Sequence, residues 1–288
     1  MNPLGMHKTE MLAKLGYSAR GIVYLLVGAM ALFGSIGGGR DVDSKSALDI
    51  ILEQPLGWIW LGLVALGLLC FVLWRVVQAV YNPDRQPDSS KGYAIRAGLA
   101  VSAVTYLSLA LYAAGHAFSL SLGSDGGGSG EESLAAWLMS QPFGRLLAFL
   151  AGLAIIGAGI AQIGKGVKKG YSKYISIPLD KRAILEPVCT FGLLARGAVF
   201  LITGVFFLYA AWRVDPSQAG SLADAMDWVR ALPFGGILYA IAALGLFAFG
   251  VYSLIEARYR HIARVDPTAV PKEMASKLGV NTATLGPR

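Results

Sequence analysis

Residues 16–36 read GYSARGIVYLLVGAMALFGSI, and this stretch decides the fold class. After Arg20 it carries no charge, and its length matches the roughly 20 residues that an α-helix needs to cross a hydrocarbon core of about 30 Å. Similar apolar runs recur along the chain. They predict six transmembrane helices, at about 17–36, 56–81, 93–118, 142–164, 190–212 and 234–257.

The composition agrees with a membrane protein. Hydrophobic residues make up 55% of the 288 residues and charged residues only 15%, whereas a soluble domain has about 45–50% and about 25%. The mean hydropathy is +0.55. We therefore expect an all-α integral membrane protein, with residues 1–288 forming a single membrane domain.

The basic residues predict how the chain crosses the membrane. Twenty of the 25 Lys and Arg residues fall in 1–20, 75–96, 165–196 and 258–288, all on one side of the predicted spans. By the positive-inside rule this side is cytoplasmic, so both termini and the tail 263–288 are expected in the cytoplasm. The net charge of +7 therefore reflects topology, and no nucleic-acid partner is expected.

Comparison of the chain with itself reveals a threefold internal repeat. GYSAR at 16–20, GYAIR at 92–96 and GLLAR at 192–196 each open an odd-numbered span, and QPLG at 54–57, QPFG at 141–144 and LPFG at 232–235 each open an even-numbered one. Two anchors in a fixed order make chance an unlikely cause. The predicted repeats cover residues 12–84, 88–174 and 188–262.

A short amphipathic helix is predicted between the two spans of each repeat. Positions four, five, seven and eight before each proline are apolar, as on one face of a helix. We expect these helices to lie on the outer surface of the membrane. Since every repeat contains two spans, the three parallel hairpins are expected to show pseudo-threefold symmetry about the bilayer normal.

These residues resemble a known family, the bacterial membrane proteins grouped as domain of unknown function 1206. The resemblance covers residues 12–262 and rests on the G-x-x-A-R-G openings at 16–21 and 192–197 and on the closing sequence GVYSLIEARYR at 250–260. The second repeat departs from this pattern at Ile95 and Ala97 and at Gly164-Lys165-Gly166. The resemblance implies tandem two-span units in a bacterial plasma (inner) membrane, and it implies no reaction.

Three arginines at equivalent repeat positions, Arg20, Arg96 and Arg196, are the first candidate site. If the repeats bring them together, they form a cationic ring that suits an anionic lipid headgroup or phosphate. The alternative is that each arginine reaches the interface or pairs with an acid such as Glu256. Other polar side chains also fall near the cytoplasmic ends of predicted spans, namely Arg75, Gln78, Gln162 and Glu256.

Lys168 and Lys169 lie in the densest predicted cytoplasmic cluster of charge. Such a cluster attracts anionic lipid, at about 1 kcal/mol per residue, or docks an acidic partner. The histidines His7, His116 and His261 lack the spacing of metal or haem ligands, and no acid or base stands where it could activate a nucleophile. We expect no catalytic residue, no metal and no cofactor.

The leading functional hypothesis is a non-enzymatic integral membrane protein, an accessory or scaffold subunit that binds lipid and another membrane protein. Short connections, many small residues and little charge inside the spans favour it. The alternative is a small-solute transporter or channel with an axial path through the three repeats. Few polar side chains at the span centres are available to coordinate a solute.

Overall fold

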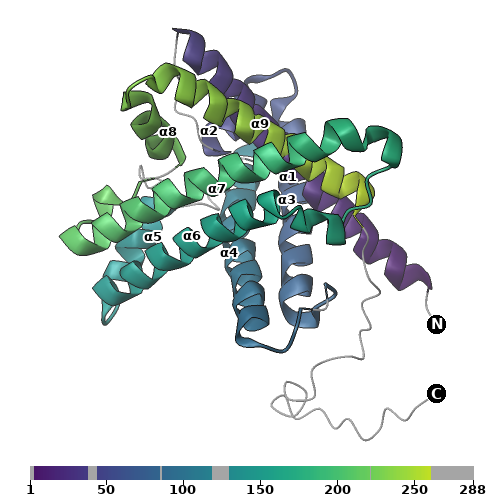
Figure 1. Ribbon diagram of the computed structural model, residues 1–288, viewed down its shortest axis with the longest axis horizontal. Helices are drawn as coiled ribbons and strands as arrows, with labels where there is room; N and C mark the ends of the chain where they lie inside the picture. The colour runs from purple at the N-terminus through teal and green to yellow at the C-terminus, as the bar shows by residue number, and fades with distance from the viewer. Residues whose placement is uncertain (1–2, 38–43, 85, 119–129, 221, 261–288) are drawn as a thin grey trace, which may run out of the picture.

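The computed structural model describes residues 3–37, 44–84, 86–118, 130–220 and 222–260. This part of the chain is helical throughout, with one isolated β-bridge between Ile175 and Arg260 (Figure 1). The tail 263–288 lies outside the described residues. The elements are α1 (Pro3–Gly37), α2 (Ser44–Glu53), α3 (Gly57–Tyr81), α4 (Ser90–Phe118), α5 (Gly130–Met139), α6 (Gly144–Val167), η1 (Gly170–Lys173), η2 (Leu179–Lys181), α7 (Arg182–Arg213), η3 (Pro216–Gln218), α8 (Leu222–Ala231) and α9 (Gly235–Tyr259).

Six helices are long and apolar enough to cross a membrane, which confirms the six predicted spans. They are α1, α3, α4, α6, α7 and α9. The helix that carries the fifth span begins at Arg182, before the predicted start at 190, and continues through Pro187. A proline removes one backbone hydrogen bond, and here the loss falls close to the helix N-terminus, where it disturbs the helix least. An ion pair between Arg182 and Glu186 stabilises the helical turn that precedes Pro187.

The short helices predicted between the spans are present as α2, α5 and α8. Each is followed by the same break. The residue after each proline has a left-handed backbone, with φ of 59° at Leu56, 61° at Phe143 and 60° at Phe234. Such a backbone is strained for bulky side chains. The next residue is a glycine, because a Cβ there would lie 1.9–2.3 Å from a carbonyl oxygen of the preceding helix.

The spans pack side by side in the order α4, α3, α1, α9, α7, α6. A closed ring of three hairpins would also pair α4 with α6. In the described residues these two helices share no extended interface, and Figure 1 shows α3 and α4 running down the view while α6 and α7 run across it. The arrangement is therefore a ring that is open within repeat 2.

Two of the three interfaces between repeats use the same glycine contacts. Gly28 of α1 packs on Phe247 of α9, and Gly204 of α7 packs on Ile156 of α6, at equivalent repeat positions. The equivalent residue of α4 is Val104, which is exposed. The α3–α4 interface therefore differs from the other two, and the predicted pseudo-threefold symmetry is not confirmed.

The sequence differences of repeat 2 explain why the ring is open there. In repeats 1 and 3 two contacts join the paired spans: a glycine packs on a phenylalanine, and an alanine packs on a glycine. These contacts are Gly16–Phe71 and Ala19–Gly67 in repeat 1, and Gly192–Phe249 and Ala195–Gly245 in repeat 3.

In repeat 2 the phenylalanine is replaced by Ala158, the alanine by Ile95 and the second glycine by Ala154, and all three are exposed. The larger Ile95 and Ala154 prevent the close backbone approach that small residues permit in membranes. The missing phenylalanine removes the main packing partner. Repeat 2 therefore lacks the residues that hold the other two hairpins closed.

Candidate functional site

A group of buried and partly buried charged side chains lies at the end of the bundle where α3, α6 and α9 finish, which we call the basic end. We define the buried basic cluster as Arg20, Arg75, Asp84, Lys165, Arg196, Glu256 and Arg260. Its members come from α1, α3, α6, α7 and α9 and from the segments that follow α3 and α9. All three repeats contribute.

Glu256 lies at the centre of the cluster, and its side chain is 3% exposed. Its carboxylate accepts hydrogen bonds from Arg20 Nη2 at 2.5 Å and from Arg260 Nη1 at 3.0 Å. Lys165 Nζ lies 3.8 Å away, and Arg20 Nε donates to Ser253 Oγ at 3.1 Å. One turn of α9 thus presents both acceptors for Arg20, because Ser253 and Glu256 are three residues apart and such residues share a helix face.

Asp84 is the second acid of the cluster. Its two carboxylate oxygens accept hydrogen bonds from Arg260 Nη2, at 2.9 and 3.0 Å. One of them also accepts a hydrogen bond from Gln78 Nε2 at 2.7 Å. Gln78 in turn accepts from Arg75 Nη1 at 3.2 Å. A continuous chain of polar contacts therefore runs from Arg75 to Arg260 and on to Glu256.

Aromatic rings separate the guanidinium groups. Arg20 Cζ lies 5.0 Å from the centre of the Phe71 ring and 5.2 Å from that of Phe249. Arg75 packs on Phe71 at 4.6 Å, and Arg196 packs on Phe249 at 4.5 Å. Cation–π contacts of this kind partly replace water around a buried cation. Phe71 and Phe249 are the same phenylalanines that close repeats 1 and 3.

The cluster contains five cationic and two acidic side chains. Two of its guanidinium nitrogens, Nε of Arg75 and Nε of Arg260, are buried and lack a hydrogen-bond partner among the described residues. A buried charge is costly unless it is paired. The cluster therefore has an excess of positive charge and two hydrogen-bond donors that the described residues leave unused.

The structure brings two of the three predicted arginines together. Arg20 and Arg196 contact the same Phe249 ring, whereas Arg96 donates to the carbonyl oxygens of Ala79 and Val80 at the end of α3, at 2.7 and 3.0 Å. Arg20 pairs with Glu256, as one of the two sequence hypotheses expected. Arg196 donates to the hydroxyl of Tyr24 at 3.2 Å.

The two predicted lysines lie on the surface, outside the cluster. Lys168 ends α6 and is exposed. Lys169 forms an ion pair with Glu186 at 2.5 Å. The hydrogen bond that Lys169 Nζ donates to this carboxylate, together with the negative charge of Glu186, raises the pKa of Lys169 above the ordinary lysine value.

Two members of the cluster were missed by the sequence analysis, Asp84 and Arg260. Asp84 follows the end of α3 in a polar segment, and nothing in its neighbourhood marks it as buried. Arg260 stands four residues after Glu256, the spacing of an ion pair on one helix face, so a signal existed.

The open side of repeat 2 is the second notable feature. We define the repeat-2 face as the exposed side of α4 and α6 that includes Gly98, Thr105, Ser108, Gly157 and Gly164. A Cβ added at any of the three glycines would meet no atom within 4 Å. The two hydroxyls donate to carbonyl oxygens of their own helix, at 3.2 and 2.8 Å.

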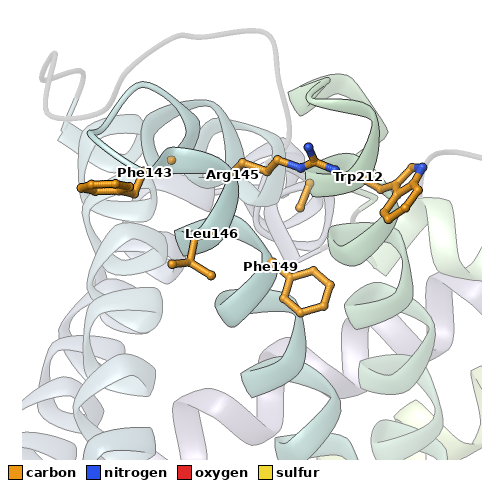
Figure 2. Close-up of a pocket in the computed structure, with 7 residues that line it drawn as sticks. Phe143, Arg145, Leu146, Phe149 and Trp212 are labelled. Carbon is orange, nitrogen blue, oxygen red and sulfur yellow. The ribbon is translucent and has the colours of Figure 1, made fainter.

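A shallow apolar groove of about 470 Å³ lies at the opposite end of the bundle, between α6 and α7 (Figure 2). Phe143, Leu146, Phe149 and Trp212 line it, and the Arg145 guanidinium lies 5.6 Å from the Trp212 ring. Exposed tryptophans also gather towards this end, at Trp58 and Trp60 in the first turn of α3. Aromatic residues of this kind are typical of a membrane interface.

No group of three or more His, Cys, Asp or Glu side chains that could hold a metal ion occurs in the ranges that the structure describes. A family model described as Domain of Unknown Function (DUF1206) matches residues 15–82, 97–169 and 191–260. A protein of Bacillus subtilis (strain 168), described as "Uncharacterized protein YxxB", is 31% identical over 252 residues, which are 86% of this chain and 90% of that protein. No solved structure matches the chain.

Proposed function

This chain, in which six helices are long and apolar enough to cross a membrane and three segments match the family model, belongs to the DUF1206 family, and from that premise we propose that it is a non-enzymatic scaffold or accessory subunit. It binds membrane lipid and one other membrane protein. The observation that carries the proposal is the open ring. α4 and α6 do not pair, although the equivalent helices of repeats 1 and 3 do.

The occupant of the repeat-2 face is a transmembrane helix of the other protein. Association of helices inside a membrane depends on close backbone approach and on hydrogen bonds between helices. Gly98, Gly157 and Gly164 allow such an approach, and Thr105 and Ser108 carry hydroxyl oxygens that can accept a hydrogen bond. The acyl chain of a lipid packs on a helix without close backbone approach and forms no hydrogen bond. The face also continues the interfaces that α4 makes with α3 and α6 makes with α7.

The proposal includes an orientation. The basic end, with most of the Lys and Arg residues, faces the cytoplasm of the bacterial plasma membrane, and the end with α2, α5 and α8 faces outwards. The positive-inside rule supports this orientation. The tryptophans of the outer end then lie at headgroup depth, as does the groove beside Trp212.

The structure favours the scaffold over the alternative of a transporter or channel. The largest fully buried side chains are aromatic and aliphatic, among them Phe71, Phe249, Leu61 and Leu68. A solute path requires polar groups that replace its hydration shell. The polar side chains of the buried basic cluster lie at one end of the bundle, where most of them pair with one another, and they do not line a path through it.

Leucines placed on the repeat-2 face provide the test. In the double variant Gly98→Leu/Gly157→Leu, the added side chains block the approach of a partner helix, and a Cβ at either position meets no other atom of the described residues within 4 Å. We expect at least a tenfold loss of the membrane protein that co-purifies stoichiometrically with the wild-type chain in mild detergent. Quantitative mass spectrometry of the purified sample measures this loss.

The matched control is Gly236→Leu, because a Cβ at Gly236 at the start of α9 also meets no atom within 4 Å. It should keep the partner. If the wild-type chain purifies only with copies of itself, or if the double variant keeps its partner as fully as the control, the proposed partner helix does not exist.

A further inference from the structure

We propose that the buried basic cluster binds one phosphate group, held between Arg75 and Arg260. This inference deepens the lipid-binding part of the proposed function and does not depend on the partner helix. The repeat-2 face contributes none of the residues that it uses.

The argument begins with the balance of charge. Five cations face two carboxylates in a part of the protein where Arg20 and Glu256 are each 3% exposed. The carboxylates are already occupied: Glu256 accepts from two arginines, and Asp84 accepts from Arg260 and Gln78. Among the described residues, Arg75 and Arg196 form no ion pair with either acid. Arg75 donates to Gln78, and Arg196 donates to Tyr24.

The second step concerns the unfilled donors. Among the described residues, Nε of Arg260 and Nε of Arg75 have no hydrogen-bond partner, and the Arg260 side chain is only 6% exposed. Gln78 and Asp84 link these two arginines, so they lie at one site in the cluster. A buried donor without an acceptor is destabilising, and more so when it belongs to a charged group. The two Nε–H groups can therefore donate to an acceptor that the described residues do not provide.

The chemistry of the acceptor follows from the donors. Guanidinium groups bind phosphate oxygens well. Arg75 donates through Nη1 to Gln78. Both terminal nitrogens of Arg260 already donate to Glu256 and Asp84, so Arg260 offers its Nε alone. A phosphate has enough oxygens to bridge two arginines, and its negative charge reduces the excess positive charge of the cluster. The cluster lies at the ends of α3 and α9, which is the depth at which lipid headgroups carry their phosphates. The phosphate comes from an anionic lipid or from solution.

Two rings contact Arg260 and bound the site. Arg260 Cζ lies 5.2 Å from the centre of the Tyr17 ring and 5.0 Å from that of Tyr174. Lys165 Nζ lies 5.9 Å from the same Tyr174 ring and is 29% exposed, so it can add a further cation at the entrance. The site is therefore bounded by the two tyrosine rings and by the partly exposed ammonium group of Lys165.

The experiment uses the full chain in nanodiscs of phosphatidylcholine, with and without phosphatidylglycerol, and in detergent with inorganic phosphate. Native mass spectrometry counts the bound lipid, and thermal unfolding measures the effect on stability. We expect one retained phosphatidylglycerol per chain, with a rise in melting temperature. Arg75→Gln should reduce its retention at least tenfold. Arg75→Lys should recover only part of the lipid retention, because lysine keeps the positive charge but lacks the planar guanidinium group.

Arg258→Gln is the matched control, since Arg258 is an exposed arginine at the same end of α9. It should retain the lipid. If inorganic phosphate alone raises the melting temperature of the wild-type chain but not of Arg75→Gln, free phosphate is the ligand and the site stands. If neither phosphate nor phosphatidylglycerol distinguishes the wild-type chain from Arg75→Gln, the site does not exist.

Discussion

The variant Glu256→Gln is expected to lose about 3–5 kcal/mol of stability, the range for a buried ion pair from which one partner is removed. The carboxylate accepts from Arg20 at 2.5 Å and from Arg260 at 3.0 Å. A neutral amide leaves these guanidinium groups with no charged acceptor at the same place. Unfolding in mixed micelles of mild detergent and dodecyl sulfate measures the change.

Two further variants test the reason for this loss. The double variant Arg20→Gln/Glu256→Gln should lose less than the sum of the two single changes, because it also removes one of the stranded cations. Lys14→Gln breaks an exposed pair with Glu10 and should lose no more than about 1 kcal/mol. Equal losses in Glu256→Gln and Lys14→Gln would show that the cluster does not hold the helices together.

The variant Phe249→Ala is expected to lose about 3–5 kcal/mol, the range for a large aromatic residue removed from a packed interior. Phe249 is 1% exposed and packs on Gly192 across the α7–α9 interface. It also lies between Arg20 and Arg196. The change gives repeat 3 the residue that repeat 2 carries at Ala158, so the α7–α9 hairpin should loosen. Unfolding in mixed micelles and hydrogen exchange in α7 report these two effects.

Phe33→Ala is the control for this experiment. Phe33 lies on α1 and is 75% exposed, so its removal leaves no internal cavity. It should change stability by less than about 0.5 kcal/mol. If Phe249→Ala is as stable as Phe33→Ala, the phenylalanine does not close repeat 3, and the explanation for the open repeat 2 is wrong.

Much of the fold could be predicted from sequence, because apolar length and local repeats determine it. The apolar runs after Arg20, Arg96 and Arg196 and those after the three proline anchors predicted six spans, and the apolar positions before each proline predicted the three short helices. The left-handed residue after each proline is equally repeated. These features depend on local sequence, so one sequence suffices to identify them.

The open ring was not predicted from the sequence, because it depends on pairs of residues far apart in the chain. Ile95 stood out as a departure in repeat 2, yet its consequence depends on what Ala19 and Ala195 touch in the other repeats. Only the structure shows that they pack on Gly67 and Gly245. Repeat 2 lacks the equivalent contact, and the symmetry expected from the repeats is not confirmed.

The site was predicted in part, for a similar reason. Arg20 and Glu256 were both noted, and their pairing was one of two stated hypotheses. The convergence of Arg75, Asp84 and Arg260 depends on how α3 and α9 end beside each other, and periodicity within one helix does not encode it. Arg96, equivalent in sequence to Arg20, lies at a different interface because α4 packs differently.

The most direct measurement of the central claim is photo-crosslinking in native membranes, with benzoylphenylalanine in place of Ala158 on the exposed side of α6. Ile241, exposed on α9, serves as the comparison position. We expect Ala158 to yield one adduct with a single other membrane protein, which Ile241 does not yield. An adduct with α4 of the same chain would mean that the ring is closed, and adducts with lipid alone would mean that no partner helix occupies repeat 2. Either result would contradict the account.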